Sequence, residues 1–233
     1  NVESDLLRQE MKAGKGLSRL MDGTRYWDLR RLEKLGARWA DIITAITNVD
    51  LEYYMKLKDP ERVFLLPFGY PTTKEPGNPV QNTEDPNTVY FFGSMDWPPN
   101  AVAARNLVEK IMPEVWKAIP EAKCFLVGKN PGEQIIALGS RKVTVTGKVP
   151  SVREYYRRAA VVAVPIGGVG GVKIKLMEAM AAGKAIVSTP AGAAGVMVEH
   201  GKHLLIADRP ADFARALTEL LGNESARRKL GSR

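Results

Sequence analysis

Short apolar runs alternate with segments of helical periodicity along the last two thirds of the chain. The runs predict strands at 89–92, 124–127, 143–146, 161–166, 186–189 and 204–207. The periodic segments predict helices at 101–119, 132–138, 151–160, 173–182 and 211–221. Because the strands are apolar throughout rather than alternating, they indicate a parallel sheet covered on both faces. The expected fold class is α/β, a doubly wound, Rossmann-like parallel sheet.

Two helix starts in this part carry side chains that commonly cap helices. Asn100 follows two prolines and is expected to be the N-cap of the helix over 101–119. Ser151 is expected to cap the helix over 151–160, with Glu154 completing a capping box.

The first part of the chain has a different pattern. Segments 4–20 and 26–38 are predicted to be helical, and 42–47 and 63–66 to be strands. These elements are too few to form a stable sheet of their own. A Pro/Asn-rich stretch over 71–87 then predicts a linker. The chain is therefore expected to divide into an incomplete α/β segment (1–70), a linker (71–87) and a Rossmann-like domain (88–233).

Residues 164–189 form the most informative stretch of the sequence: an apolar strand, a glycine-rich loop, a basic helix carrying one acid, and a second strand. Glycines such as Gly170 and Gly171 let a ligand approach the backbone closely. The start of the helix offers unpaired N–H groups to an anion. Lys173 and Lys175 add cationic donors, and Glu178 is placed to accept hydrogen bonds from hydroxyl groups. The stretch predicts a site for a nucleoside diphosphate, whereas the alternative is a tight turn with a surface acid.

Further candidates lie where other strands end, because ligands of doubly wound sheets bind at the carboxyl ends of the strands. Gly93 and Ser94 are expected to line the path of the pyrophosphate, and Gly147 and Val149 to lie beside the nucleobase. The predicted binding residues are Gly93, Ser94, Gly147, Val149, Gly170, Gly171, Val172, Lys173, Lys175 and Glu178. Simple turns between strand and helix are the alternative at each of these glycines.

The amino-acid composition limits the kinds of site that the chain can hold. One cysteine (Cys124) and two histidines (His200 and His203) supply neither a metal-ligand cluster nor a Cys–His nucleophile pair. We therefore expect no metal and no cofactor. The net charge of +8 lies in the last part, since residues 88–233 carry 21 basic and 12 acidic side chains. That excess suits a diphosphate ligand, an anionic membrane surface or a nucleic acid, and a merely solvated basic surface remains an alternative.

The string from Lys175 to Thr189 resembles the donor-site signature of the family 4 (group 1) glycosyltransferases, which have the two-domain GT-B fold. Segments 92–100, 126–128 and 145–149 add to the resemblance, which is strong over 88–233 and looser over 1–70. It is most similar to a bacterial branch that transfers sugars in exopolysaccharide and cell-envelope synthesis. The resemblance implies that the chain is a fragment holding the C-terminal donor domain and a remnant of the acceptor-side domain.

Two features depart from the family pattern. The signature has two glutamates eight residues apart; Glu178 matches the second, whereas Gly170 stands in place of the first. The usual basic pair near the first strand is also absent, because 94–100 contains no lysine or arginine. Neutralisation of the phosphates would then fall on Lys173, Lys175 and backbone amides, and the catalytic residues are not identified.

The function implied by the resemblance is retaining, metal-independent transfer of a hexosyl group from a nucleotide-diphosphosugar to a glycan or lipid-linked acceptor. The fragment is expected to bind the donor but to be inactive without its missing N-terminal half, in cis or, as the less favoured alternative, on a partner chain. We expect a cytoplasmic protein with no nucleic-acid partner. Peripheral contact with the inner face of the membrane is an alternative that the sequence leaves open. The alternatives are a non-catalytic nucleotide-binding module that docks on membrane or nucleic acid, and a sugar-nucleotide epimerase with the GT-B fold.

Overall fold

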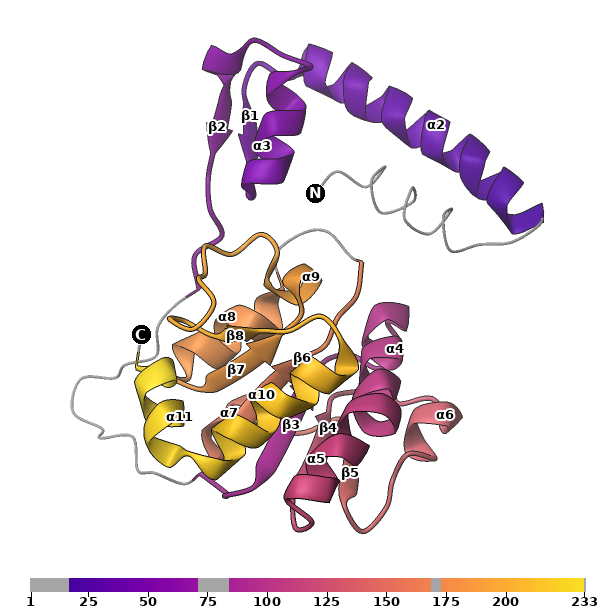
Figure 1. The fold of residues 1–233 in the computed structure, drawn as a ribbon. Helices are drawn as coiled ribbons and strands as arrows, with labels where there is room; N and C mark the ends of the chain where they lie inside the picture. Colours follow the sequence, from indigo (N-terminus) through magenta and orange to yellow (C-terminus); the bar gives the residue numbers. More distant parts are fainter. Residues whose placement is uncertain (1–16, 71–83, 169–172, 233) are drawn as a thin grey trace. The chain divides into compact units, whose positions relative to one another are not determined.

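A computed structural model of the chain describes residues 17–70, 84–168 and 173–232 (Figure 1). The contacts divide the chain into two compact units, one built mainly from the residues up to Gly69 and one mainly from those after it. The expected helix over 4–20 lies largely outside the described residues, as do most of the predicted linker and the tip of the glycine loop.

The second unit is built on a six-stranded, wholly parallel sheet in the order β5-β4-β3-β6-β7-β8. Its strands are β3 (Thr88–Phe92), β4 (Lys123–Val127), β5 (Val143–Gly147), β6 (Val161–Val164), β7 (Ala185–Ser188) and β8 (Leu205–Ile206). All residues of β3, β6 and β7 are buried, which explains their unbroken apolar runs. The expected fold class, a doubly wound Rossmann-like sheet, is confirmed.

Helices connect the strands and cover the sheet: α4 (Pro98–Asn106), α5 (Met112–Ala118), α6 (Glu133–Ile136), α7 (Val152–Arg158), α8 (Ile174–Ala181), α9 (Pro190–Ala193), α10 (Pro210–Gly222) and α11 (Glu224–Gly231). Figure 1 shows α10 in front of the sheet, where it packs against α5, β6 and β7. The chain proceeds from β3 outward to β5 and then returns to β6 on the other side of β3. This change of direction creates a switch point between β3 and β6, the place where such sheets bind ligands.

Three details of the predicted helices were wrong. The segment over 101–119 is interrupted by a π-helical turn (Leu107–Ile111) just before Pro113, which has no N–H to continue the hydrogen-bond ladder. Trp97 rather than Asn100 holds the N-cap position of α4, because Pro98 and Pro99 already belong to the helix.

At α7 the capping box does not form. Ser151 holds the N-cap position but makes no side-chain cap bond. Glu154 turns instead toward Arg157, one turn further along the helix, at 3.5 Å.

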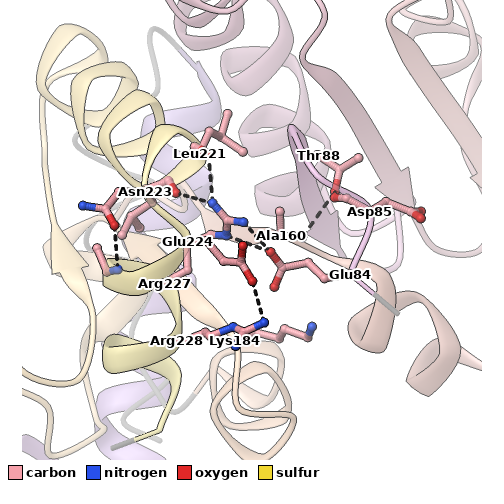
Figure 2. A network of polar contacts seen from close by, with 12 residues as sticks. Glu84, Asp85, Thr88, Ala160, Lys184, Leu221, Asn223, Glu224, Arg227 and Arg228 are labelled. Atoms are coloured by element: carbon pink, nitrogen blue, oxygen red, sulfur yellow. Dashed lines mark hydrogen bonds and ion pairs between the residues drawn. The ribbon is translucent and has the colours of Figure 1, made fainter. Parts of the chain in front are cut away.

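The C-terminal helix is anchored by a buried ion pair. Arg227 of α11, 6% exposed, contacts Glu84 at 2.7 Å and donates to the carbonyl oxygens of Leu220 and Leu221 at 2.8 and 2.9 Å. Figure 2 shows this guanidinium between the end of α10 and the segment that precedes β3. The pair therefore holds α11 against the segment that leads into the sheet.

The first unit contains α2 (Leu17–Trp39), β1 (Ile43–Ala45), α3 (Asn48–Met55), a 3-10 turn (Pro60–Arg62) and β2 (Val63–Leu65). β1 and β2 pair in parallel, and α3 forms the crossover between them. The sequence reading missed α3, which begins with a reciprocal bond. Thr47 Oγ1 accepts from the Asp50 amide at 3.1 Å and donates to the Asp50 carboxylate at 2.8 Å.

Candidate functional site

A cavity of about 350 Å³ opens where β3, β4 and β5 end. Its walls come from these strand ends, from the start of α7 and from α8. The lining residues are Phe92, Gly93, Ser94, Val127, Gly128, Lys129, Lys148, Val149, Val152, Lys175 and Glu178. The cavity thus lies at the carboxyl edge of the parallel sheet, next to its switch point.

Two glycines let the chain pass closely at this edge. A Cβ on Gly128, whose φ is +155°, would lie 1.8 Å from the carbonyl oxygen of Gly93. A Cβ on Gly93 would lie 2.7 Å from the Asn100 side-chain nitrogen and 2.9 Å from the Lys175 ammonium. Glycine is therefore required at position 128, where the clash is with backbone, whereas a Cβ at position 93 would displace the Asn100 amide and the Lys175 ammonium.

Lys175 brings the positive charge of the site. Its Nζ donates to Asn100 Oδ1 at 2.5 Å and lies 4.7 Å from the centroid of the Phe91 ring. Burial and, to a smaller extent, the charge of Lys173 lower the pKa of Lys175, Glu178 acts in the opposite direction, and the pKa that results is about 7. The nearby Lys173 is buried, and this burial lowers its pKa to about 8. An anionic ligand would favour the charged form of both groups.

The carboxylate of Glu178 supplies the negative charge of the site and accepts hydrogen bonds from two tyrosine hydroxyl groups. Tyr156 donates to its Oε2 at 3.0 Å and Tyr70 to its Oε1 at 3.3 Å. Tyr156 is buried, and its ring stacks on Phe92 with centroids 3.7 Å apart. Desolvation and the neighbouring carboxylate both raise the pKa of Tyr156, so this hydroxyl keeps its proton and remains a donor.

Of the residues predicted from the sequence, the fold brings Gly93, Ser94, Val149, Lys175 and Glu178 to one cavity. Gly147 and Lys173 lie nearby in the chain but not in its lining. Gly147 has φ +66° and ends β5, so it turns the chain toward Val149. Gly170, Gly171 and Val172 lie outside the described residues.

Sequence reasoning missed Asn100 and the two tyrosines as parts of this site. Tyr156 lies 22 positions from Glu178, and Asn100 lies 75 positions from Lys175. No local pattern signals such contacts. The two histidines lie outside the cavity lining, where His200 Nδ1 accepts from the Ile206 amide and His203 Nδ1 from the Glu199 amide.

Within the described residues, three or more His, Cys, Asp or Glu side chains nowhere gather as a metal-binding group. The helices described there include none that could span a bilayer.

A doubly wound parallel sheet with a charged cavity at its carboxyl edge, next to the switch point, is typical of nucleotide-binding α/β proteins. Comparison with known families makes this more specific. The profile described as "Glycosyl transferases group 1" matches residues 86–223, more than half of the chain. The chain belongs to this family. No curated protein sequence matches the chain significantly.

Solved structures with the same fold are GT-B glycosyltransferases. TarM superposes with a TM-score of 0.73 at 15% identity, over 88% of this chain and 41% of TarM. HepE of Anabaena in complex with UDP gives 0.66 at 19% identity, over 85% of this chain and 58% of HepE. WaaG, a glycosyltransferase involved in lipopolysaccharide biosynthesis, gives 0.65 at 18% identity, over 97% of this chain and 66% of WaaG. The chain therefore spans less than two thirds of the length of these proteins.

Proposed function

We propose that this chain supplies the donor site for retaining, metal-independent transfer of a hexosyl group from a nucleotide-diphosphosugar to a glycan or lipid-linked acceptor. One observation carries the proposal: a lysine with a lowered pKa and a hydrogen-bonded carboxylate line the same cavity at the carboxyl edge of the sheet. The ammonium suits a diphosphate, and the carboxylate suits hydroxyl groups such as those of a ribose.

The related structures support the choice of ligand. HepE has been solved with UDP, with UDP and glucose, and with UDP-glucose. A TarM variant has been solved with UDP together with sugar compounds. WaaG is a glycosyltransferase involved in lipopolysaccharide biosynthesis, which supports a role in cell-envelope polysaccharide synthesis. We propose that the protein has this role on the cytoplasmic side.

The proposed role of the site in the reaction is electrostatic. The bond between the anomeric carbon and the diphosphate oxygen breaks, and the diphosphate leaves with the electron pair. The acceptor oxygen bonds to that carbon and its proton passes to the leaving diphosphate. A positive charge already in place where the leaving group gains negative charge lowers the barrier. We propose that Lys175, with Lys173 behind it, has this role, and that Glu178 holds the nucleoside.

The proposed domain roles follow the same scheme. Residues 88–233 form the donor domain, and residues 1–70 belong to the acceptor-side domain, with 71–87 as the linker. Trp39 and Leu66 of the first unit are 82% and 62% exposed, which fits apolar surface that further chain would cover. The proposed fragment binds the donor without turning it over.

Isothermal titration with UDP-glucose, a GDP-sugar and an ADP-sugar tests this function. We expect one donor class to bind and Glu178→Gln to weaken its affinity about tenfold, because a charge-assisted hydrogen bond becomes a neutral one. Glu109→Gln, at an exposed position of the π-helical turn outside the cavity lining, is the matched control and should bind as the wild type does. Equal affinity of the wild type and the Glu178→Gln variant would remove this carboxylate from the site.

A further inference from the structure

The side-chain amide of Asn100 connects three segments of the donor domain. It is 8% exposed and lies in the first turn of α4, where Trp97 already holds the cap position. Its Oδ1 accepts from Lys175 Nζ at 2.5 Å, and its Nδ2 donates to the carbonyl oxygen of Ser94 at 2.8 Å. The ammonium group has only donors and the carbonyl only lone pairs, so both ends of the amide meet a matching partner. This chemistry fixes its orientation.

The amide differs from a carboxylate in what it does to the ammonium. A carboxylate at this position would neutralise Lys175, whereas an amide oxygen accepts a hydrogen bond and leaves the positive charge uncompensated. The ring of Phe91, 4.7 Å from Nζ, is likewise an uncharged neighbour. The contacts of Lys175 with these two residues therefore orient the ammonium and keep its charge available to an anion in the cavity.

The Gly93–Ser94 turn also packs against the Asn100 side chain. Gly93 has no Cβ, and one placed there would lie 2.7 Å from Asn100 Nδ2 and 2.9 Å from Lys175 Nζ. Ser94, whose carbonyl the amide holds, lines the cavity together with Gly93 and Lys175. The position of the turn and the position of the ammonium thus depend on one side chain.

We propose that Asn100 is a positioning residue of the diphosphate subsite: its amide places the Lys175 ammonium at the cavity and fixes the Gly93–Ser94 turn beside it. This inference rests on the proposed function, since it takes the cavity to hold a nucleoside diphosphate. The inference predicts that Asn100 affects the binding of the phosphate groups and not the binding of the nucleoside.

Binding of UDP, inorganic pyrophosphate and uridine to the wild type and to Asn100→Ala, Asn100→Asp and Asn106→Ala tests the proposal. UDP and pyrophosphate are followed by calorimetry and uridine by NMR titration. We expect Asn100→Ala to lower the affinity for UDP and for pyrophosphate about tenfold, which is the scale of one hydrogen bond to a charged group. The affinity for uridine should be unchanged. Asn100→Asp should lower the affinity for UDP and pyrophosphate further, because its carboxylate neutralises the ammonium and repels the anionic ligand. Asn106, at the other end of α4 and outside the cavity lining, is the matched control.

The titration of Lys175, followed by the 13Cε shift of labelled lysine, separates positioning from a purely structural role. Removing an acceptor from the charged form lowers the pKa of Lys175, so Asn100→Ala should lower it. The nearly isosteric Asn100→Asp should raise it, and this variant keeps the test valid if the alanine variant does not fold. If Asn100 had a purely structural role, Asn100→Ala would instead lower the affinities for uridine and UDP alike and leave the pKa of Lys175 unchanged.

The outcomes distinguish the inference from the function on which it rests. If the wild type binds UDP or pyrophosphate and Asn100→Ala binds them equally well, the positioning role is refuted and the donor site stands. If the wild type binds neither phosphate compound, and binds neither GDP nor ADP, the proposed function fails and the inference fails with it.

Discussion

The buried pair of Arg227 and Glu84 gives the most direct test of what stabilises the second unit. The Arg227 side chain is 7% exposed and that of Glu84 16% exposed. Arg227→Met keeps much of the side-chain length and removes the charge. It leaves the Glu84 carboxylate without its guanidinium and removes the donor that Arg227 supplies to the carbonyl oxygens of Leu220 and Leu221, of which Leu220 keeps the Asn223 amide. An unpaired buried charge costs about 3–5 kcal/mol, so we expect a loss of this size.

The neighbouring arginine provides a matched control. Arg228 pairs with Glu224 one turn away on the same helix, but its side chain is 66% exposed. Exposed pairs of this kind contribute about 0.5 kcal/mol or less. Arg228→Met should therefore leave the domain almost as stable as the wild type. The two substitutions are chemically identical and differ only in the burial of the pair that they break.

Urea unfolding and calorimetric melting provide the measurements. For a domain of this size, a loss of about 3–5 kcal/mol lowers the melting temperature by roughly 6–20 °C. The double variant Arg227→Met with Glu84→Gln should be less destabilised than the sum of the single variants, by about 1–3 kcal/mol. Equal effects of Arg227→Met and Arg228→Met would refute the reasoning, as would a coupling energy near zero.

Three further predictions concern the cavity. Gly128→Ala should cost at least about 3 kcal/mol in urea unfolding, because its Cβ would meet a backbone oxygen at 1.8 Å, whereas Gly132→Ala, with open space around it, should be tolerated. Tyr156→Phe removes the hydroxyl that donates 3.0 Å to the carboxylate of α8; it should weaken nucleotide binding in calorimetry by about fivefold to tenfold, and Tyr155→Phe should not. Affinity for UDP-glucose should be constant below about pH 7 and fall by up to about tenfold per pH unit above it. The reason is that Lys175 has its pKa lowered to about 7, is already charged at lower pH, and must take up a proton on binding at higher pH. A flat profile from about pH 6 to about pH 9 would contradict this coupling.

The strands were predictable because burial on both faces leaves a strong signal. In the Val161–Val164 and Ala185–Ser188 strands every residue is buried, so the apolar runs mark the elements directly. The parallel direction of the strands follows from the same pattern, since a helix between two strands makes a parallel crossover, whereas the order of the strands was not predicted. The position of the site at the carboxyl edge of the sheet was therefore available from the sequence.

The ends of helices were less predictable because a cap depends on backbone angles and not only on residue type. Asn100 and Ser151 both have side chains that suit a cap, yet neither forms a cap hydrogen bond. Asn223 does so, and its Oδ1 accepts from the Ala226 amide at 2.9 Å at the start of α11, a helix that the sequence reading missed. That helix is mostly polar, and its apolar positions Ala226 and Leu230 are too few to identify a helix as the many apolar residues of α10 do.

The contacts that orient the site could not be predicted, because they join residues that the fold brings together from distant segments. Lys175 and Glu178 were found through a local motif, whereas their partners Asn100 and Tyr156 belong to other helices. Asn100 looks like a cap in the sequence, and Tyr156 like an ordinary packing residue. Only the fold shows that each holds a charged group.

The arrangement of the two charged groups on α8 supports the proposal that the site binds a nucleoside diphosphate. Lys175 and Glu178 are three residues apart, a spacing at which opposite charges commonly pair on a helix surface. Here the ammonium donates to an amide oxygen of α4, and the carboxylate accepts from two phenols. Neutral partners orient both charges without cancelling either, so one cavity offers a cation and a hydrogen-bond acceptor side by side. A ligand that carries phosphates at one end and ribose hydroxyls next to them matches both groups, whereas a simple anion would use only one.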